Sequence, residues 1–404
     1  MGQVLILGAG ECGLPLAHRL LRGGVAVTLL TNRDAEAVLA GGVTSTQVKF
    51  APTLELESDA GIGMWRTSAP QINGIRFTMV VDRQPVVQWM GKLSRPAQSV
   101  DQRTVFARWL AEVEAAGGEL RIVDPSIEQL DRYAAEHELT IVTKATGMLA
   151  DRFAPDPAWV TPPAPQRRLA VLYLFGVPAD PDDFGSYTVL PGHGEVISYR
   201  GLTGLPGREQ QCEMLLFEAV PGGCLDVFGT ELSAGERLGH AMRLLAAHLP
   251  PGTAERYATA ELTDSGATLV GAVTPSMRRP IGSLPSGRPI LGGGDVVCRM
   301  DPGGAQGANN AAHCAAHYAA AILGHRGGPF DRPWMDAVAA QWLTDIAHPA
   351  ARWTEALLDP PPPLQQLVVA AQQDPVLANT FADTFARPAA MADLAVRLGH
   401  ADAD

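Results

Sequence analysis

Three glycines with the spacing GxGxxG lie near the N-terminus of the chain. The loop that carries them consists of Gly8, Ala9, Gly10, Glu11, Cys12 and Gly13. It follows an apolar run at 4–7, typical of a buried parallel strand, and precedes a helical pattern that ends at two glycines. In this context the first glycine allows a tight turn, the second lets a pyrophosphate approach the backbone, and the third lets helix and strand pack closely. The helix N-terminus adds free N–H groups, so the loop predicts a dinucleotide site.

The second apolar strand, at 25–30, ends without the acidic residue that usually binds ribose hydroxyls in such units. The chain reads Thr31, Asn32 and Arg33 at this point. Thr31 or Asn32 can hydrogen-bond a ribose, although a neutral group does so more weakly than a carboxylate. We therefore expect a dinucleotide that is held less firmly at its ribose.

A second glycine-rich segment follows another buried strand at 289–292. It contains Gly294, Asp295, Pro302, Gly307, Ala308 and Asn309, and it opens an alanine-rich helix over 310–323. A loop this rich in glycine lets backbone atoms approach a flat ligand, and the helix N-terminus stabilises negative charge. The segment therefore predicts a second contact with the same ligand.

Composition limits the classes of protein that this chain can be. With 404 residues it exceeds what a single core usually supports, and its 46% hydrophobic residues are ordinary for a globular protein. The net charge of −12 argues against nucleic-acid binding, because few cations are left to neutralise phosphates. The five cysteines are odd in number and scattered, which is typical of a reduced, cytoplasmic chain without a disulfide framework. We find no secretory signal, no membrane-spanning run and no metal-ligand motif.

The order of apolar patterns predicts an α/β (α+β) protein: a Rossmann-like domain with an inserted antiparallel-sheet domain and a helical C-terminal tail. We expect the dinucleotide-binding domain over 1–165, with a hairpin near 73–92, the antiparallel domain over 166–265, a return to the first domain over 266–325, and a helical region over 326–404. A proline-rich link near 154–165 marks the first boundary, and alternating runs such as 169–174 suggest antiparallel strands.

The GD…P…GQGxN pattern of residues 294–309 resembles the FAD-binding flavoprotein monooxygenases of the p-hydroxybenzoate hydroxylase fold. Within that fold, three further segments are similar to the styrene and indole monooxygenases: 191–195 (PGHGE), 99–103 (SVDQR) and 352–354 (RWT). Those enzymes are the oxygenase halves of two-component systems. The resemblance implies that an NAD(P)H-dependent flavin reductase supplies reduced FAD. That FAD would react with O2 to a C4a-hydroperoxide, which epoxidises or hydroxylates a small aromatic alkene or indole. It also suggests a homodimer.

The resemblance assigns roles to individual residues. Asp295 would bind flavin ribityl or ribose hydroxyls, and Arg103 would reach the pyrophosphate, for which a guanidinium is well suited. Pro302, Gly307, Ala308 and Asn309 would lie against the isoalloxazine. Ser45, Thr46 and Gln47 would pass the reactive edge of the ring, with Ser45 where the family has asparagine. The residues that we expect near the substrate are Met64, Phe77, Met79 and His193.

Three other functions remain open from the sequence. A single-component hydroxylase of the same fold would consume NAD(P)H directly. A flavin-dependent halogenase is disfavoured, because its paired-tryptophan motif is not evident. The last alternative is a non-catalytic flavin-binding protein.

Overall fold

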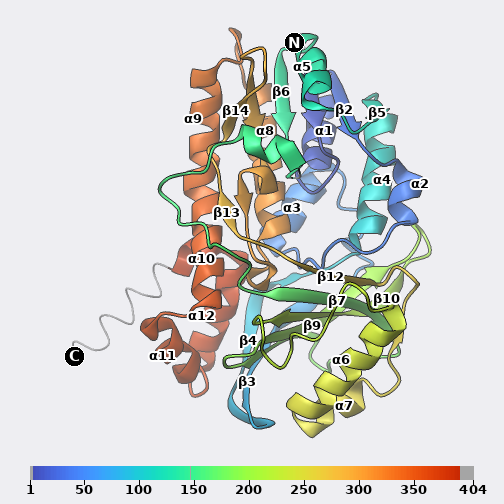
Figure 1. The fold of residues 1–404 in the computed structure, drawn as a ribbon, viewed down its shortest axis with the longest axis vertical. Helices are drawn as coiled ribbons and strands as arrows, with labels where there is room; N and C mark the ends of the chain where they lie inside the picture. Colours follow the sequence, from blue (N-terminus) through green and yellow to red (C-terminus); the bar gives the residue numbers. More distant parts are fainter. Residues whose placement is uncertain (1–2, 146, 392–404) are drawn as a thin grey trace.

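A six-stranded, mostly parallel sheet forms the upper half of the molecule in Figure 1. The computed structural model describes residues 3–145 and 147–391. The strands follow the order β14-β15-β6-β1-β2-β5, and only β14 runs antiparallel to its neighbour. Their bounds are β1 (Val4–Leu7), β2 (Val27–Thr31), β5 (Glu119–Ile122), β6 (Leu139–Val142), β14 (Ile281–Ser283) and β15 (Pro289–Gly292). This is the expected Rossmann-like sheet, in which β1 and β2 pair in parallel across the glycine loop.

Helices cover both faces of this sheet. They are α1 (Gly13–Arg22), α2 (Ala35–Leu39), α3 (Ala51–Ala60), α4 (Gln102–Ala115), α5 (Ile127–Ala135) and α8 (Gly307–Leu323). The side chain of Asp101 caps the N-terminus of α4 by accepting from the backbone N–H of Arg103. Helices α1 and α8 pack against each other, so the glycine loop and the second glycine-rich segment open onto the same space.

The lower half of Figure 1 is an eight-stranded sheet. Its order is β11-β7-β10-β9-β8-β3-β4, and β12 pairs with β7 beside that path. Its strands are β3 (Ile72–Val81), β4 (Gln84–Ala97), β7 (Arg168–Phe175), β8 (Phe184–Leu190), β9 (Gly194–Thr203), β10 (Gln210–Ala219), β11 (Glu261–Leu262) and β12 (Thr268–Ala272). A separate pair consists of β13 (Ser276–Met277) and β16 (Cys298–Arg299).

Two features of the second sheet differ from the expected antiparallel insertion over 166–265. The hairpin β3–β4 belongs to this sheet, and β3 pairs in parallel with β8. The sheet also continues past residue 265, since β12 pairs with β7. The physical reason is burial. Alternate residues of β3 are apolar and pack into the core of the second sheet, whereas a hairpin attached only to the first domain would leave them exposed.

The remaining helices lie outside the two sheets. Helices α6 (Ala234–His248) and α7 (Pro251–Arg256) lie below the second sheet. Helices α9 (Arg332–Trp342), α10 (His348–Leu358), α11 (Pro362–Ala370) and α12 (Pro375–Ala386) descend along one side of the molecule (Figure 1). Helix α12 packs against β4. The part of the expected helical tail beyond 391 lies outside the described residues. Within the described ranges, no helix is both long and apolar enough to cross a bilayer.

Candidate functional site

A cavity of about 680 Å³ lies where the carboxyl ends of β1, β2 and β6 meet. This is the edge at which open parallel sheets bind ligands, and the volume lies within the roughly 300–1,000 Å³ of typical cofactor sites. Its walls include both segments singled out by the sequence. The expected cofactor residues that line it are Gly8, Gly10, Glu11, Cys12, Thr31, Asn32, Asp295, Pro302, Gly307 and Ala308.

The glycine loop has the geometry that a pyrophosphate site needs. Gly8 has a φ of +117°, and a Cβ there would lie 2.6 Å from Oγ1 of Thr143. A Cβ on Gly13 would collide with the carbonyl oxygen of Gly8, so this third glycine permits the close contact of helix and turn. A Cβ on Gly10 would meet nothing within 4 Å, because this glycine faces the open cavity. The space around the three glycines is therefore compatible with the three separate roles expected of them.

The ribose end of the cavity lacks a free acidic partner at β2. The Thr31 hydroxyl is engaged in its own turn, where it donates to the carbonyl of Arg33 at 3.2 Å. The Asn32 side chain is exposed and lines the cavity beside Arg33. Asn32 is thus the freer hydrogen-bonding group of the two expected residues.

Three cations line the cavity, and the sequence reasoning assigned none of them to the ligand: Arg33, Lys144 and Arg299. Lys144 Nζ lies 2.5 Å from Asp124 Oδ1, and an Arg299 guanidinium N–H donates to the carbonyl of Ala145. Arg33 and Lys144 follow the carboxyl ends of the parallel strands β2 and β6 directly. Their position in the sequence, just after two apolar strands, could have indicated a place in the cavity, because the carboxyl ends of parallel strands meet at one edge of the sheet.

Asp295 faces the cavity from the turn after β15. Its side chain is accessible through the cavity yet surrounded by protein, and this burial raises the pKa of its carboxyl to about 6, with a smaller contribution from Glu11. Arg299 acts in the opposite direction. Near neutral pH the group is a carboxylate that can accept hydrogen bonds from hydroxyls.

The far end of the cavity is formed by the Pro302–Ala305 loop and the N-terminus of α8. Gly307 begins this helix, and a Cβ there would meet nothing within 4 Å. The free N–H groups of a 17-residue helix favour negative charge at this end. Asn309 does not line the cavity. Its amide instead accepts from the Phe50 N–H and the Thr53 hydroxyl and donates to the carbonyl of Val48, because the residues before α3 pack against this turn.

The cavity is also lined by the segment that was expected beside the flavin ring, Ser45, Thr46 and Gln47. Their polar groups are largely occupied. The Ser45 hydroxyl donates to the Thr46 carbonyl at 2.9 Å, and the Gln47 amide donates to the carbonyl of Val100. The Oε1 atom of Gln47 accepts from no group among the described residues, so it is the free acceptor of this segment.

A second, apolar pocket adjoins the far end of the cavity. The two spaces share four residues, Thr46, Leu216, Pro302 and Ala305. Other walls come from the second sheet and the C-terminal helices, including Ile75, Tyr187, Ile197, Tyr199 and Phe385. Burial raises the pKa of both tyrosine hydroxyls, so they remain neutral. The pocket is suited to a small, uncharged apolar molecule.

The four residues expected near the substrate do not line this pocket. Phe77 stacks on Trp89 at 4.8 Å within the core of the second sheet, and Met79 packs against the same core. Met64 packs against the core of the first half. His193 is exposed in the β8–β9 turn, where Nδ1 accepts from the Cys224 N–H at 3.3 Å. These expectations are corrected: Ile75, which lies on the same strand face as Phe77 but two residues earlier along β3, lines the pocket, while Phe77 and Met79 lie further along that face in the core.

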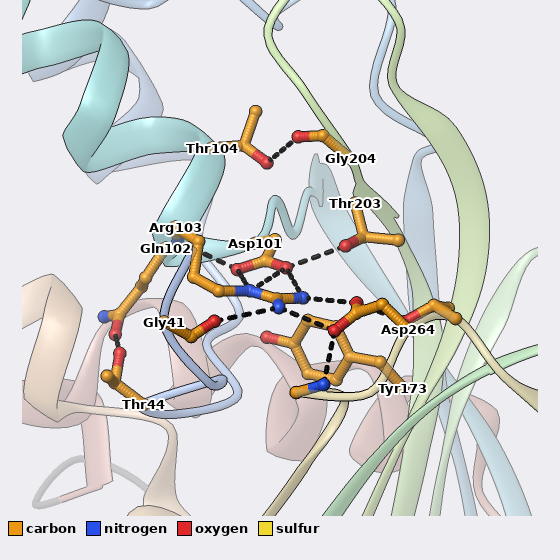
Figure 2. A network of polar contacts seen from close by, with 12 residues as sticks. Gly41, Thr44, Asp101, Gln102, Arg103, Thr104, Tyr173, Thr203, Gly204 and Asp264 are labelled. Atoms are coloured by element: carbon orange, nitrogen blue, oxygen red, sulfur yellow. Dashed lines mark hydrogen bonds and ion pairs between the residues drawn. The ribbon is translucent and has the colours of Figure 1, made fainter. Parts of the chain in front are cut away.

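Arg103 does not line the cavity either. Figure 2 shows its side chain within a network of polar contacts. Its guanidinium forms two parallel bonds of 2.9 Å with Asp264 and bonds of 2.7 and 3.0 Å with Asp101. Burial alone would lower the pKa of Arg103, but these hydrogen bonds raise it. Two carboxylates thus bind the side chain that was expected at the pyrophosphate. An additional bond to the carbonyl of Gly41 makes Arg103 a positioning residue for the segment before Ser45.

A buried ion cluster lies behind the glycine loop. Lys49 Nζ lies 3.0 Å from Glu11 Oε2 and 2.6 Å from Glu57 Oε1, and all three side chains are less than one-tenth exposed. The same ammonium lies 4.5 Å from the centre of the Trp109 ring. Burial would lower the pKa of Lys49, but Glu11 and Glu57 raise it. The lysine therefore stays charged and neutralises a carboxylate that faces the cavity next to Gly10.

Two comparisons place these features among known proteins. A model of the styrene monooxygenase A substrate-binding domain matches residues 146–256, which include β7–β10 and α6. The styrene monooxygenase StyA of Pseudomonas fluorescens is 28% identical over 401 residues, covering 96% of this chain and 93% of that protein. StyA of a second Pseudomonas is 27% identical over the same shares. This chain is therefore similar to styrene monooxygenases over nearly its whole length.

Solved structures agree with this fold. A triple mutant of the flavin-dependent brominase Bmp2 superposes with a TM-score of 0.65 at 12% identity, with all of both chains covered. HpxO of Klebsiella pneumoniae, an R-to-Q variant complexed with FAD, gives 0.59 at 14% identity and covers 98% of this chain and 99% of that one. The comparisons together support an FAD-dependent monooxygenase. The cavity fits FAD in three features that line it: a glycine loop open at Gly10, cations after the strand ends, and a helix N-terminus at Gly307.

Proposed function

We propose that this protein is the oxygenase component of a two-component system that oxygenates a small, neutral aromatic molecule. The observation that carries the proposal is the junction of the two spaces. The apolar pocket adjoins the larger cavity, and Thr46, Leu216, Pro302 and Ala305 line both spaces. A substrate in that pocket would lie next to the reactive edge of the flavin.

Reduced FAD, when bound, supplies the activation of O2 and the transfer of one oxygen atom to the substrate. The protein's own contribution is binding, orientation and exclusion of water. Asn32, Asp295 and the cations at the strand ends would hold the dinucleotide. The α8 N-terminus would favour a ring with negative charge, which supports tighter binding of reduced than of oxidised FAD.

The carboxylate missing at the end of β2 supports a flavin that exchanges between turnovers. With Thr31 engaged in its own turn, the ribose finds fewer strong partners. We infer that the partner is a separate NAD(P)H-dependent flavin reductase that delivers reduced FAD. The five free cysteines are compatible with the reducing cytoplasm, in which such a reductase acts.

The test combines the purified chain with FAD, NADH, catalase and an unrelated flavin reductase. Indole, styrene and an aryl sulfide serve as substrates. We expect oxygenated product only when chain and reductase are both present, and indigo from indole would identify the substrate class. NADH consumption by the chain alone would instead favour a single-component hydroxylase. Absence of both FAD binding and product would favour a non-catalytic protein.

A pocket variant provides the matched control. Ile75 lines the apolar pocket but not the dinucleotide cavity. Ile75→Trp should abolish product formation while FAD affinity stays at the wild-type value. Unchanged turnover of the largest substrate in this variant would place the substrate elsewhere.

A further inference from the structure

Two carboxyl groups lie behind the Pro302–Ala305 loop without any basic partner of their own. Glu218, near the end of β10, and Asp301, directly before the loop, are both 0% exposed. One oxygen of Asp301 accepts from the Gly303 N–H at 3.1 Å. Among the described residues, no N–H or hydroxyl donates to the other oxygen of Asp301 or to either oxygen of Glu218. Buried oxygens without donors are costly, so a proton on one carboxyl is the group that can satisfy the pair.

The surrounding charges do not supply a second cation. The titratable and charged groups that face Glu218 are Asp301, Glu195 of β9, Arg167 before β7, Tyr187 of β8 and Tyr199 of β9. Arg167 already forms a two-bond ion pair with Glu195, at 2.7 and 2.9 Å. Burial, and then Asp301 and Glu195, raise the pKa of Glu218 well above the ordinary range of a carboxyl.

Glu218 is in direct contact with the loop. A Cβ on Gly303 would lie 2.6 Å from Glu218 Oε2, so the absence of a side chain at Gly303 lets the loop rest on this carboxyl. On the other side, a Cβ on Gly304 would collide with the Thr354 hydroxyl of α10. The loop is therefore fixed between Glu218 and Thr354, and its residues Pro302 and Ala305 line both the dinucleotide cavity and the apolar pocket.

We propose that Glu218 and Asp301 share one proton and act as a positioning pair, which holds the Pro302–Ala305 loop in the conformation that receives the flavin ring. Glu218 donates the proton to the free oxygen of Asp301. Loss of that proton would leave two buried carboxylates in contact and force them and the loop apart. The inference rests on the proposed function in one respect only, that a flavin ring lies against this loop.

The first experiment needs no flavin. Because the folded protein keeps a proton on Glu218 that the unfolded chain loses near its ordinary pKa, unfolding releases this proton, and stability falls as pH rises above that value. Glu218→Gln keeps the shape and the donor but cannot ionise. We expect the wild-type unfolding constant, from urea titrations between pH 5 and 9, to rise relative to that of the variant by up to tenfold per pH unit. Parallel pH profiles would overturn the shared proton.

The second experiment tests positioning through the affinity for FAD, measured by flavin fluorescence over the same pH range. Glu218→Gln should bind FAD as tightly as the wild type at pH 6 and retain this affinity at alkaline pH, where the wild type weakens. Glu218→Leu, which has no donor, should bind more weakly at every pH. Equal weakening by both variants at all pH values would overturn the positioning role.

Two further variants keep the outcomes distinct. Glu213→Gln removes another fully buried glutamate of β10, one that pairs with Arg256 away from the loop, and it should keep the wild-type pH profile of FAD binding. Asp301→Asn is the replacement if Glu218→Gln does not fold, and it should flatten the stability profile in part, because it removes the contribution of Asp301 to the raised pKa of Glu218 but not that of burial. Failure of the wild type to bind FAD at any pH would overturn the proposed function, while the flavin-free titration would still decide on the shared proton.

Discussion

The two ends of the dinucleotide cavity neutralise buried carboxylates by different means. Behind the glycine loop, Lys49 forms ion pairs with Glu11 and Glu57. Behind the Pro302–Ala305 loop, no residue in the described part of the chain supplies such a cation to Glu218 and Asp301, and a proton takes its place. An ammonium keeps its charge across the physiological pH range, whereas a proton on a carboxyl leaves when the pH rises far enough.

The positive charge that stabilises the carboxylates is therefore permanent at the phosphate end, whereas the proton at the ring end depends on pH. The phosphate end must bind a ligand whose charge is fixed, so a constant countercharge to Glu11 suits it. The ring end must accept a ring whose charge changes with its redox state. A neutral acid there keeps an additional negative charge away from the reduced ring.

Lys49→Met should have the largest effect. It leaves Glu11 and Glu57 buried without a partner, which typically costs about 3–5 kcal/mol in the free energy of unfolding. Chemical denaturation measures this loss, and FAD affinity should fall as well because Glu11 faces the cavity. Adding Glu11→Gln should recover part of both. A double variant no better than Lys49→Met would contradict the role assigned to the lysine.

Gly303→Ala should have the next largest effect, because its methyl group would overlap Glu218 Oε2. Overpacking of this kind costs roughly 1–3 kcal/mol. Gly10→Ala is the matched control at the other end, where a Cβ meets nothing within 4 Å. We expect it to leave the melting temperature unchanged and to weaken FAD binding. If Gly303→Ala melts like the wild type, the tight contact with Glu218 is refuted.

Asp295 should make the affinity for FAD fall at acidic pH. A carboxylate accepts hydroxyl hydrogen bonds on both oxygens, so affinity should fall as pH drops through its pKa of about 6. The loss should approach tenfold per pH unit, or ~1.4 kcal/mol. Asp295→Asn should bind FAD more weakly at pH 8 and show no such fall at acidic pH. A wild-type profile that is flat between pH 5 and 7 would exclude this titration.

His193→Ala should have the smallest effect. The ring is exposed in a turn away from both spaces, and such surface changes usually lie within ~0.5 kcal/mol. Product formation with added reductase should equal that of the wild type. A clear loss of turnover, with FAD affinity unchanged, would restore the expected role of this histidine near the substrate.

The local motifs were predictable from sequence, because their chemistry depends on neighbours in the chain. The glycine loop supplied Gly8 and Gly10 to the cavity wall, and the second glycine-rich segment supplied Asp295, Pro302, Gly307 and Ala308. The substrate residues were not predictable in this way. Ile75 and Phe77 share one strand face, and which of them reaches the pocket depends on where β3 pairs along β8, more than 100 residues away in sequence.

Arg103 and Glu218 show the same limit in electrostatics. The motif around Arg103 contains Asp101, but the second carboxylate that binds its guanidinium, Asp264, comes from a distant loop. Glu218 directly follows the apolar run 214–217 near the end of β10, where a charged residue is ordinarily expected to face solvent. Its burial against Asp301 results from the packing of the second sheet on the loop, which no local pattern encodes.

The apolar pocket has one wall that comes from far along the chain. Phe385 of α12 lines it, and Gln306 donates a hydrogen bond of 2.8 Å to the Phe385 carbonyl. This helix lines none of the dinucleotide cavity. Substitutions in α12, natural or engineered, can therefore change which molecules fit the apolar pocket without changing the residues that line the dinucleotide cavity.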